Sequence, residues 1–214
     1  MTAKRNIKMT TTIICLCIFA YLLGSIPFGL VLVKTFKSVD LRKIGSSNIG
    51  ATNARRAGGW MLGLATLACD VLKGAIPVYL AGLLLAGAGG FTREIWASLV
   101  AILAFSGHLF PLYLKFKTGG KGVATAAGCI GVLSPVGLVI AFAAFILVAG
   151  FSNRVSAGSL AAAVTLPVGV FLATRSMILT GCALIISLLI IIRHKDNIKR
   201  LITGTEPTIW GKKR

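Results

Sequence analysis

The chain has 214 residues, of which 56% are hydrophobic and only 13% charged, against about 45–50% and about 25% in soluble proteins. This composition excludes a water-soluble fold. The formal net charge of +18 lies between long apolar segments, which favours anionic lipid and phosphate over nucleic acid as partners. We therefore predict an all-α integral membrane protein that forms one domain over residues 1–214.

The first apolar run extends from Thr12 to about Val33, after Lys4, Arg5 and Lys8. It is longer than the hydrophobic region of a signal peptide and no A-x-A cleavage site ends it, so we expect a membrane anchor. Five further stretches approach, reach or exceed the roughly 20 residues that a span needs. They are Trp60 to Ala88, Ile95 to Leu114, Val123 to Gly150, Val155 to Thr174 and Ser176 to Ile192.

Positive charge tests this count of six spans, because Lys and Arg concentrate in cytoplasmic loops. The loop after the first run is more basic than the N-terminus, which places the N-terminus outside. Six spans would then put the strongly basic tail outside as well. A break at Ser134-Pro135 adds one more helix to the count. Seven helices place the C-terminus, and with it the basic tail, in the cytoplasm. Residues 123–133 would then form a helix of only about 17 Å, which either spans the membrane or is re-entrant.

The first polar segment with chemical content is D-L-R-K-I-G-S-S-N-I-G-A-T-N-A-R-R, Asp40 to Arg56. Its glycines allow backbone N–H groups to line a concavity, and short polar side chains and Arg56 add donors. We expect a phosphate-binding loop here. The alternative is a polar inter-helix loop with ordinary helix caps. The candidate ligands are Ser46, Ser47, Asn48, Thr52, Asn53 and Arg56.

The second segment is F-K-T-G-G-K-G-V-A-T, Phe116 to Thr125. It lacks the G-x-x-x-x-G-K-[ST] frame and the βαβ context of a P-loop. Flexible backbone donors beside Lys121 nevertheless precede an apolar helix whose positive dipole end attracts anions. The competing interpretation is a basic loop that touches lipid headgroups.

Three ionisable residues lie inside apolar runs, where charge is costly and often functional. Asp70 and Lys73 are three apart on one helix face, so each is expected to neutralise the other. His108 lies near the end of its run and is either a base or a structural hydrogen-bonding group.

The tail begins R-H-K-D-N-I-K-R-L-I-T-G-T-E at the inner end of the last run, Arg193 to Glu206. A helix continuing through it would place His194 and Asn197 three apart and Arg193, Asn197 and Arg200 near one face. A polybasic segment that binds anionic lipid is the alternative. The short stretch from Ser152 to Ser156 adds hydroxyl groups from a third cytoplasmic loop.

Several common catalytic and metal-binding motifs are absent from the sequence. There is no G-x-S-x-G, H-E-x-x-H or aspartate-rich metal motif, and the five cysteines form no C-x-x-C pair. We expect no metal and no cofactor, so that any catalysis relies on positioning and charge.

Taken together, these segments resemble the acyl-phosphate:glycerol-3-phosphate acyltransferases, the PlsY family of small bacterial membrane enzymes. The similarity occurs in family order across nearly the whole chain. It comprises G-S-I-P-F-G at 24–29, S-x-N-x-G-A-T-N-x-x-R at 46–56, D-x-x-K-G at 70–74, G-H-x-F-P at 107–111, G-G-K-G-V-A-T at 119–125 and R-H-x-x-N-I-x-R-L-x-x-G-x-E at 193–206. Ser47 replaces a commoner glycine, and Thr118 lengthens the usual F-K-G-G-K run by one residue.

The resemblance implies seven helices in the bacterial cytoplasmic (inner) membrane. It implies transfer of an acyl group from acyl-phosphate to the 1-hydroxyl of glycerol 3-phosphate, giving lysophosphatidic acid and phosphate as the first step of phospholipid synthesis. Its partners would be these substrates, membrane lipid and, as a candidate, the soluble enzyme that makes acyl-phosphate. The implied catalytic residues are Lys121, His194 and Asn197, and the implied substrate-binding residues are Ser46, Asn48, Thr52, Asn53, Arg56 and Ser156.

Two rival functions fit the composition. A transporter of phosphorylated solutes is one, although the loops do not resemble one another as repeated halves would. A lipid-bound scaffold is the other, but it gives the embedded Asp70, Lys73 and His108 no purpose.

Overall fold

A computed structural model describes residues 2–210, with side chains from residue 9 onward, and every regular element among them is a helix. The predicted basic positions Lys4, Arg5, Lys8 and 212–214 lie outside the described side chains. The chain divides into two compact units on either side of the Leu133–Ser134 bond. A single domain over residues 1–214 stays a prediction.

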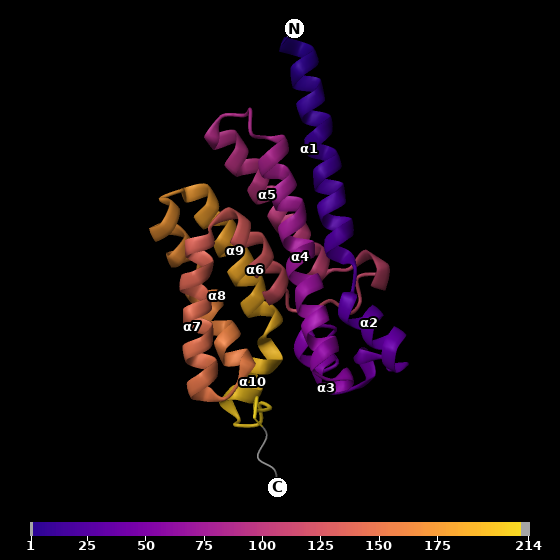
Figure 1. Cartoon of the computed structure of the whole chain (residues 1–214). Coiled ribbons are helices and arrows are strands. Elements are labelled where there is room, and N and C mark those ends of the chain that lie inside the picture. Colours follow the sequence, from indigo (N-terminus) through magenta and orange to yellow (C-terminus); the bar gives the residue numbers. More distant parts are fainter. Residues whose placement is uncertain (1, 211–214) are drawn as a thin grey trace. The chain divides into compact units, whose positions relative to one another are not determined.

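The first unit contains six α-helices in its described residues (Figure 1), and two short 3₁₀ turns at Leu41–Lys43 and Leu112–Leu114 connect some of them. Helix α1 packs against α5, and α4 packs against both α5 and α6. The helices are α1 (Thr2–Ser25), α2 (Phe28–Lys37), α3 (Ala51–Gly58), α4 (Trp60–Leu84), α5 (Gly90–Leu109) and α6 (Val123–Leu133).

The second unit contains three long helices and one short helix in its described residues. Helix α8 packs against α7 and α9, while α10 follows α9 directly (Figure 1). The helices are α7 (Pro135–Ser152), α8 (Val155–Thr174), α9 (Met177–Arg193) and α10 (Lys195–Ile202).

Seven apolar helical segments occur among the described residues, in agreement with the predicted fold class. Five are long enough to cross a membrane, and α9 with α10 makes a sixth if this pair, bent by 58°, is one span. The seventh is the short helix α6. The five are Met9–Lys37, Trp60–Leu84, Gly90–Leu114, Pro135–Ser152 and Val155–Thr174.

The predicted break at Ser134-Pro135 separates α6 from α7. Pro135 is the first residue of α7, where its missing N–H costs nothing. The Ser134 hydroxyl accepts a hydrogen bond from the Gly137 N–H at 3.3 Å and caps the new helix. The long apolar run from 123 to 150 therefore forms two helices because a cap and a proline coincide.

A second break was not predicted. The run from Thr12 to Val33 is interrupted at Ile26-Pro27, so that α1 ends at Ser25 and α2 begins at Phe28. Proline has no N–H to donate to the preceding turn, and at this break the Ile26 carbonyl oxygen accepts the Phe28 N–H at 3.0 Å.

Glycines allow α4 and α6 to approach closely. A Cβ atom on Gly128 would overlap the Val71 carbonyl oxygen, and one on Gly74 would overlap the Thr125 carbonyl oxygen. Small residues at such crossings let the helix backbones touch, which is how helices associate in a membrane.

We expect Gly128→Ala to destabilise the folded protein by about 1–3 kcal/mol, because the methyl group meets backbone rather than a movable side chain. The matched control is Gly82→Ala on α4, where a Cβ meets nothing within 4 Å. The control should be neutral or slightly stabilising, since alanine favours helix. Thermal midpoints in detergent check the pair. Equal midpoints for the two variants would contradict the close crossing.

Candidate active site

The loop from Ile44 to α3 is organised around the buried side chain of Asn53. Its Nδ2 donates to the carbonyl oxygens of Leu41, Ile44 and Asn48 at 3.1, 3.2 and 2.9 Å, and its Oδ1 accepts from the Ser46 N–H at 3.3 Å. The sequence predicted a ligand for substrate at this position. The geometry instead places the amide inside the loop, where it fixes the backbone.

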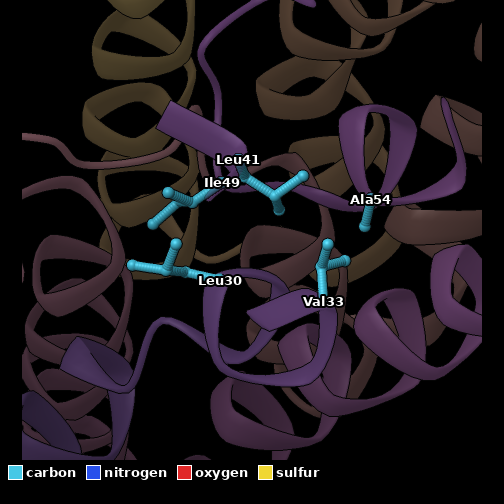
Figure 2. Close-up of a cluster of buried hydrophobic side chains, with 5 residues drawn as sticks. All are labelled: Leu30, Val33, Leu41, Ile49 and Ala54. Atoms are coloured by element: carbon cyan, nitrogen blue, oxygen red, sulfur yellow. The ribbon is translucent and has the colours of Figure 1, made fainter. Parts of the chain in front are cut away.

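An apolar cluster supports this loop from below. Figure 2 shows Leu30 and Val33 of α2 facing Leu41, Ile49 and Ala54, and all five side chains are buried. Because apolar contact is lost if the loop moves away from α2, the cluster holds the polar loop on a rigid base.

The polar groups of the loop gather around the start of α3. Gly50 is the N-cap residue and supplies no side-chain cap, while its own N–H donates to Asn48 Oδ1 at 2.9 Å. Ser46 and Arg56 are exposed and Thr52 is half-buried. An uncapped helix N-terminus beside hydroxyl groups is suited to an anion, and Arg56 adds positive charge from the last turn of the same short helix.

The two arginines in α3 have different surroundings. The guanidinium carbon of Arg55 lies 4.5 Å from the centre of the Trp60 ring, a cation–π contact that engages the side chain. Arg56 is exposed. Of the two, Arg56 is therefore the better candidate for a phosphate ligand.

Lys121 lies in the loop that precedes α6. The loop is tied to the end of α5 by a hydrogen bond from the Gly120 N–H to the His108 carbonyl oxygen at 3.0 Å. Gly122 has φ of +79°, a conformation that glycine adopts without strain, and α6 begins at Val123. Lys121 is thus held, half-buried, at the positive end of a helix dipole.

The predicted pair of Asp70 and Lys73 is confirmed. Lys73 Nζ lies 2.8 Å from Asp70 Oδ1, and both side chains are buried. His108 Nδ1 lies 3.7 Å from the same oxygen, a contact between α4 and α5 that helix periodicity could not predict.

In the second unit the tail does not continue as one helix. The chain bends at His194, and α10 begins at Lys195. The buried His194 ring lies with Nδ1 2.8 Å from the Ile190 carbonyl oxygen. Since a carbonyl only accepts, Nδ1 carries the hydrogen, and in the neutral ring Nε2 is an acceptor.

Glu206 organises the polar residues around Asn197, although the sequence reasoning did not select it. Its Oε1 accepts from Asn197 Nδ2 at 2.6 Å, and its Oε2 accepts from Arg200 Nε at 2.7 Å. The Ser156 hydroxyl faces the same carboxylate. Ser156 and Asn197, both predicted site residues, therefore meet at Glu206. Its place as the last residue of the R-H-x-x-N-I-x-R-L-x-x-G-x-E pattern was the available sequence indication.

The segment after α10 folds back onto the turn between α7 and α8. The Ile209 N–H donates to the Asn153 carbonyl oxygen at 2.9 Å, and the Trp210 N–H donates to Asn153 Oδ1 at 3.0 Å. Arg154 also donates to the Gly204 carbonyl oxygen at 3.4 Å. These contacts hold Glu206 beside the start of α8.

The surroundings of Glu206 give a pH prediction. Burial alone would raise the pKa of Glu206, but the Ser156 hydroxyl and the hydrogen bonds from Asn197 and Arg200 outweigh it and lower the pKa below its usual value of 4.5. A lowered folded-state pKa gives stability that is present above pH 4.5 and is lost as pH falls through the folded-state value.

Thermal midpoints between pH 3 and pH 7 check this expectation. The wild-type midpoint should fall with acidification below about pH 4.5, whereas that of Glu206→Gln should start lower at pH 7 and vary less over the same range. Parallel curves for the two proteins would show that another group controls acid stability.

Among residues 2–210, no group of three or more His, Cys, Asp or Glu side chains is arranged to hold a metal ion. The predicted site residues fall into two sets. Ser46, Asn48, Thr52, Asn53, Arg56 and Lys121 belong to the first unit, and Ser156, His194 and Asn197 belong to the second.

Comparison with known proteins identifies the family. The sequence pattern described as glycerol-3-phosphate acyltransferase matches residues 14–204. A protein of that name from Desulfotalea psychrophila is 46% identical over 196 residues, covering 92% of this chain and 97% of the relative. One from Syntrophotalea carbinolica is 44% identical with the same coverage of both chains. The chain belongs to the glycerol-3-phosphate acyltransferase family.

Solved structures agree with this assignment. PlsY, described as an integral membrane glycerol 3-phosphate acyltransferase, matches in its glycerol 3-phosphate form with a TM-score of 0.86 and 37% identity, covering 94% of this chain and 96% of that chain. Its lysophosphatidic acid form matches with a TM-score of 0.81 and 35% identity, covering 92% and 95%. The resemblance and the all-α membrane fold predicted from sequence are thereby confirmed, and the chain is a multi-pass membrane protein.

Proposed function

We propose that this chain transfers a fatty acyl group from acyl-phosphate to the 1-hydroxyl of glycerol 3-phosphate, producing lysophosphatidic acid and inorganic phosphate. The observation that carries the proposal is membership of the glycerol-3-phosphate acyltransferase family over nearly the whole chain. The choice of acyl-phosphate as the acyl donor rests on a further argument, namely the hydrogen-bonding and positively charged groups of the first unit.

The first unit is proposed to bind the phosphate of the acyl donor. Ser46, Thr52 and the start of α3 supply neutral donors, while Arg56 and Lys121 supply positive charge. Asn48 and Asn53 are proposed to shape the loop through their hydrogen bonds to its backbone. Neutral hydrogen-bond donors together with two cations suit the dianionic phosphate of an acyl-phosphate.

The second unit is proposed to bind glycerol 3-phosphate through Ser156, His194 and Asn197. Glu206 fixes the Asn197 amide, and the hydrogen bond to Ile190 sets the His194 ring with Nε2 as the acceptor. A hydroxyl of the substrate can donate to that nitrogen. This makes His194 a ligand that orients the nucleophile.

The proposed reaction is direct displacement at a mixed anhydride. The O1 oxygen of glycerol 3-phosphate forms a bond to the acyl carbon, and the bond from that carbon to the phosphate oxygen breaks. Phosphate departs with the electron pair, and Lys121 and Arg56 stabilise its growing charge. The O1 proton goes either to His194 Nε2 or to a substrate phosphate oxygen.

His194→Gln separates these two proton acceptors, because glutamine keeps a hydrogen-bonding group but is not a base at neutral pH. If the imidazole takes the proton, the variant should lose about 10²–10⁴-fold in kcat and its pH–rate profile should differ in shape from that of the wild type. If the phosphate takes it, the pH profile of the variant should keep the wild-type shape.

The location we propose is the bacterial inner membrane, with the basic loops in the cytoplasm, where both phosphorylated substrates would be available. The enzyme that makes acyl-phosphate is a candidate partner, because an acyl-phosphate is reactive and amphiphilic and would benefit from direct delivery.

The test is to incubate the purified protein with palmitoyl-phosphate and radiolabelled glycerol 3-phosphate and to look for labelled lysophosphatidic acid. Palmitoyl-CoA in place of palmitoyl-phosphate tests the donor. Product with palmitoyl-CoA alone would overturn the donor assignment. Uptake of label into proteoliposomes without any lipid product would overturn the acyltransferase and favour the transporter.

A further inference from the structure

Three buried ionisable residues of the first unit have no role in the proposed reaction. Asp70 and Lys73 lie on α4 and His108 lies on α5, with exposed fractions of 2%, 1% and 4%. Removing such groups from water is costly, and those that occur within membrane-spanning segments are usually tied to function. Their contacts indicate what that function is.

Asp70 is the centre of this set. Its Oδ1 lies 2.8 Å from Lys73 Nζ and 3.7 Å from His108 Nδ1. The carboxylate thus joins a cation on its own helix to an imidazole on α5. A buried ion pair adds little stability over apolar groups of the same volume. Its main contribution here is therefore to fix the relative positions of the groups that it joins.

Lys73 links this set to the break between α1 and α2. Its Nζ donates to the Ile26 carbonyl oxygen at 2.9 Å, which lies between the two helices and also accepts the Phe28 N–H at 3.0 Å. The same nitrogen lies 5.7 Å from the centre of the Phe28 ring. Lys73 therefore fixes α4 against the start of α2, the helix that carries the apolar support of the Asn53 loop.

His108 links the set to the loop that carries Lys121. The His108 carbonyl oxygen accepts the Gly120 N–H at 3.0 Å, and a Cβ atom on Gly120 would overlap the His108 ring. Gly120 is therefore held by both the backbone and the side chain of one residue. Lys121 follows directly in the chain.

We propose that Asp70, Lys73 and His108 form a positioning cluster, which holds the 118–122 loop and thereby places Lys121 for acyl transfer. The inference rests on the proposed function. None of the three is assigned a contact with substrate. Their effect on the reaction passes through Gly120 and Lys121.

The main experiment uses the double variant Asp70→Asn/Lys73→Met, which removes both charges and leaves neither one unpaired in the interior. We expect it to stay folded and to lose about tenfold or more in kcat with palmitoyl-phosphate, while KM for glycerol 3-phosphate changes by less than about threefold. Thr66→Val is the matched control, a buried polar change on the same helix, and should keep kcat within about threefold.

A double-mutant cycle distinguishes positioning from general damage. In a Lys121→Met background, Asp70→Asn/Lys73→Met should cause no further loss of kcat, because the residue that it positions is already gone. Losses that multiply would overturn the inference. His108→Gln should retain more activity than His108→Leu, because only glutamine keeps a polar group toward Asp70.

Hydrogen exchange provides a readout that does not depend on activity. The Gly120 amide should exchange about tenfold faster in Asp70→Asn/Lys73→Met than in the wild type or in Thr66→Val. Unchanged exchange would overturn the positioning cluster even if the wild type proved inactive in the acyl-transfer assay. An inactive wild type with the expected exchange would overturn the proposed function and leave the structural coupling standing.

Discussion

Replacing Lys121 with methionine should lower kcat by about 10²–10³-fold while the folded protein keeps its thermal midpoint. The proposed chemistry needs positive charge where the phosphate leaves, because negative charge grows on that group as the carbon–oxygen bond breaks. Lys121 stands at the start of α6, beside a glycine with positive φ. Methionine keeps the length of the side chain and removes the charge. Initial rates of phosphate release with saturating substrates measure the effect.

Lys117 provides the matched control for this experiment. It lies in the same connection between α5 and α6, and its side chain is exposed. Lys117→Met removes the same charge from the loop, so it should change kcat by less than about threefold, as a surface substitution does. An equal loss in the two variants would assign the effect to general surface charge and contradict a specific role for Lys121.

Arg56→Lys should raise KM for palmitoyl-phosphate by about 10–100-fold, since lysine keeps the charge but loses the planar fork that binds phosphate with two parallel hydrogen bonds. Arg56 is exposed on α3, two residues before the end of the helix. The structure gives it no aromatic partner like that of Arg55 within the described residues. Steady-state kinetics over a range of donor concentrations measure the change.

Arg55→Lys is the internal comparison. The Arg55 guanidinium stacks on Trp60 at 4.5 Å, so its loss should weaken a local contact worth about 0.5–1 kcal/mol at an exposed site. We expect KM for palmitoyl-phosphate to stay within about twofold of the wild type. If Arg55→Lys has the larger effect on KM, the two arginines have been assigned the wrong way round.

Features that depend on sequence neighbours were predictable. The Ser134-Pro135 break follows from the chemistry of a cap and a proline. The contact of Asp70 with Lys73 follows from helical spacing alone. Two span boundaries were also close: α8 begins and ends at the predicted residues Val155 and Thr174, and α9 covers Met177–Arg193 where Ser176 to Ile192 was predicted.

Features that depend on contacts between distant segments were not predictable. Asn53 was expected to face a ligand, but the carbonyl oxygens of Leu41, Ile44 and Asn48 satisfy its amide inside the loop. A tail that continues as one helix was one interpretation, yet the chain bends at His194. Glu206 gained importance only when folding brought it to Asn197 and Ser156. Composition and periodicity carry no information on such pairings.

The central claim is acyl transfer from acyl-phosphate to glycerol 3-phosphate, and the ratio of its two products tests it most directly. Purified protein with palmitoyl-phosphate and radiolabelled glycerol 3-phosphate should release one phosphate for each labelled lysophosphatidic acid formed, and omission of either substrate should stop both. Release of phosphate from palmitoyl-phosphate without any labelled lipid would contradict the account.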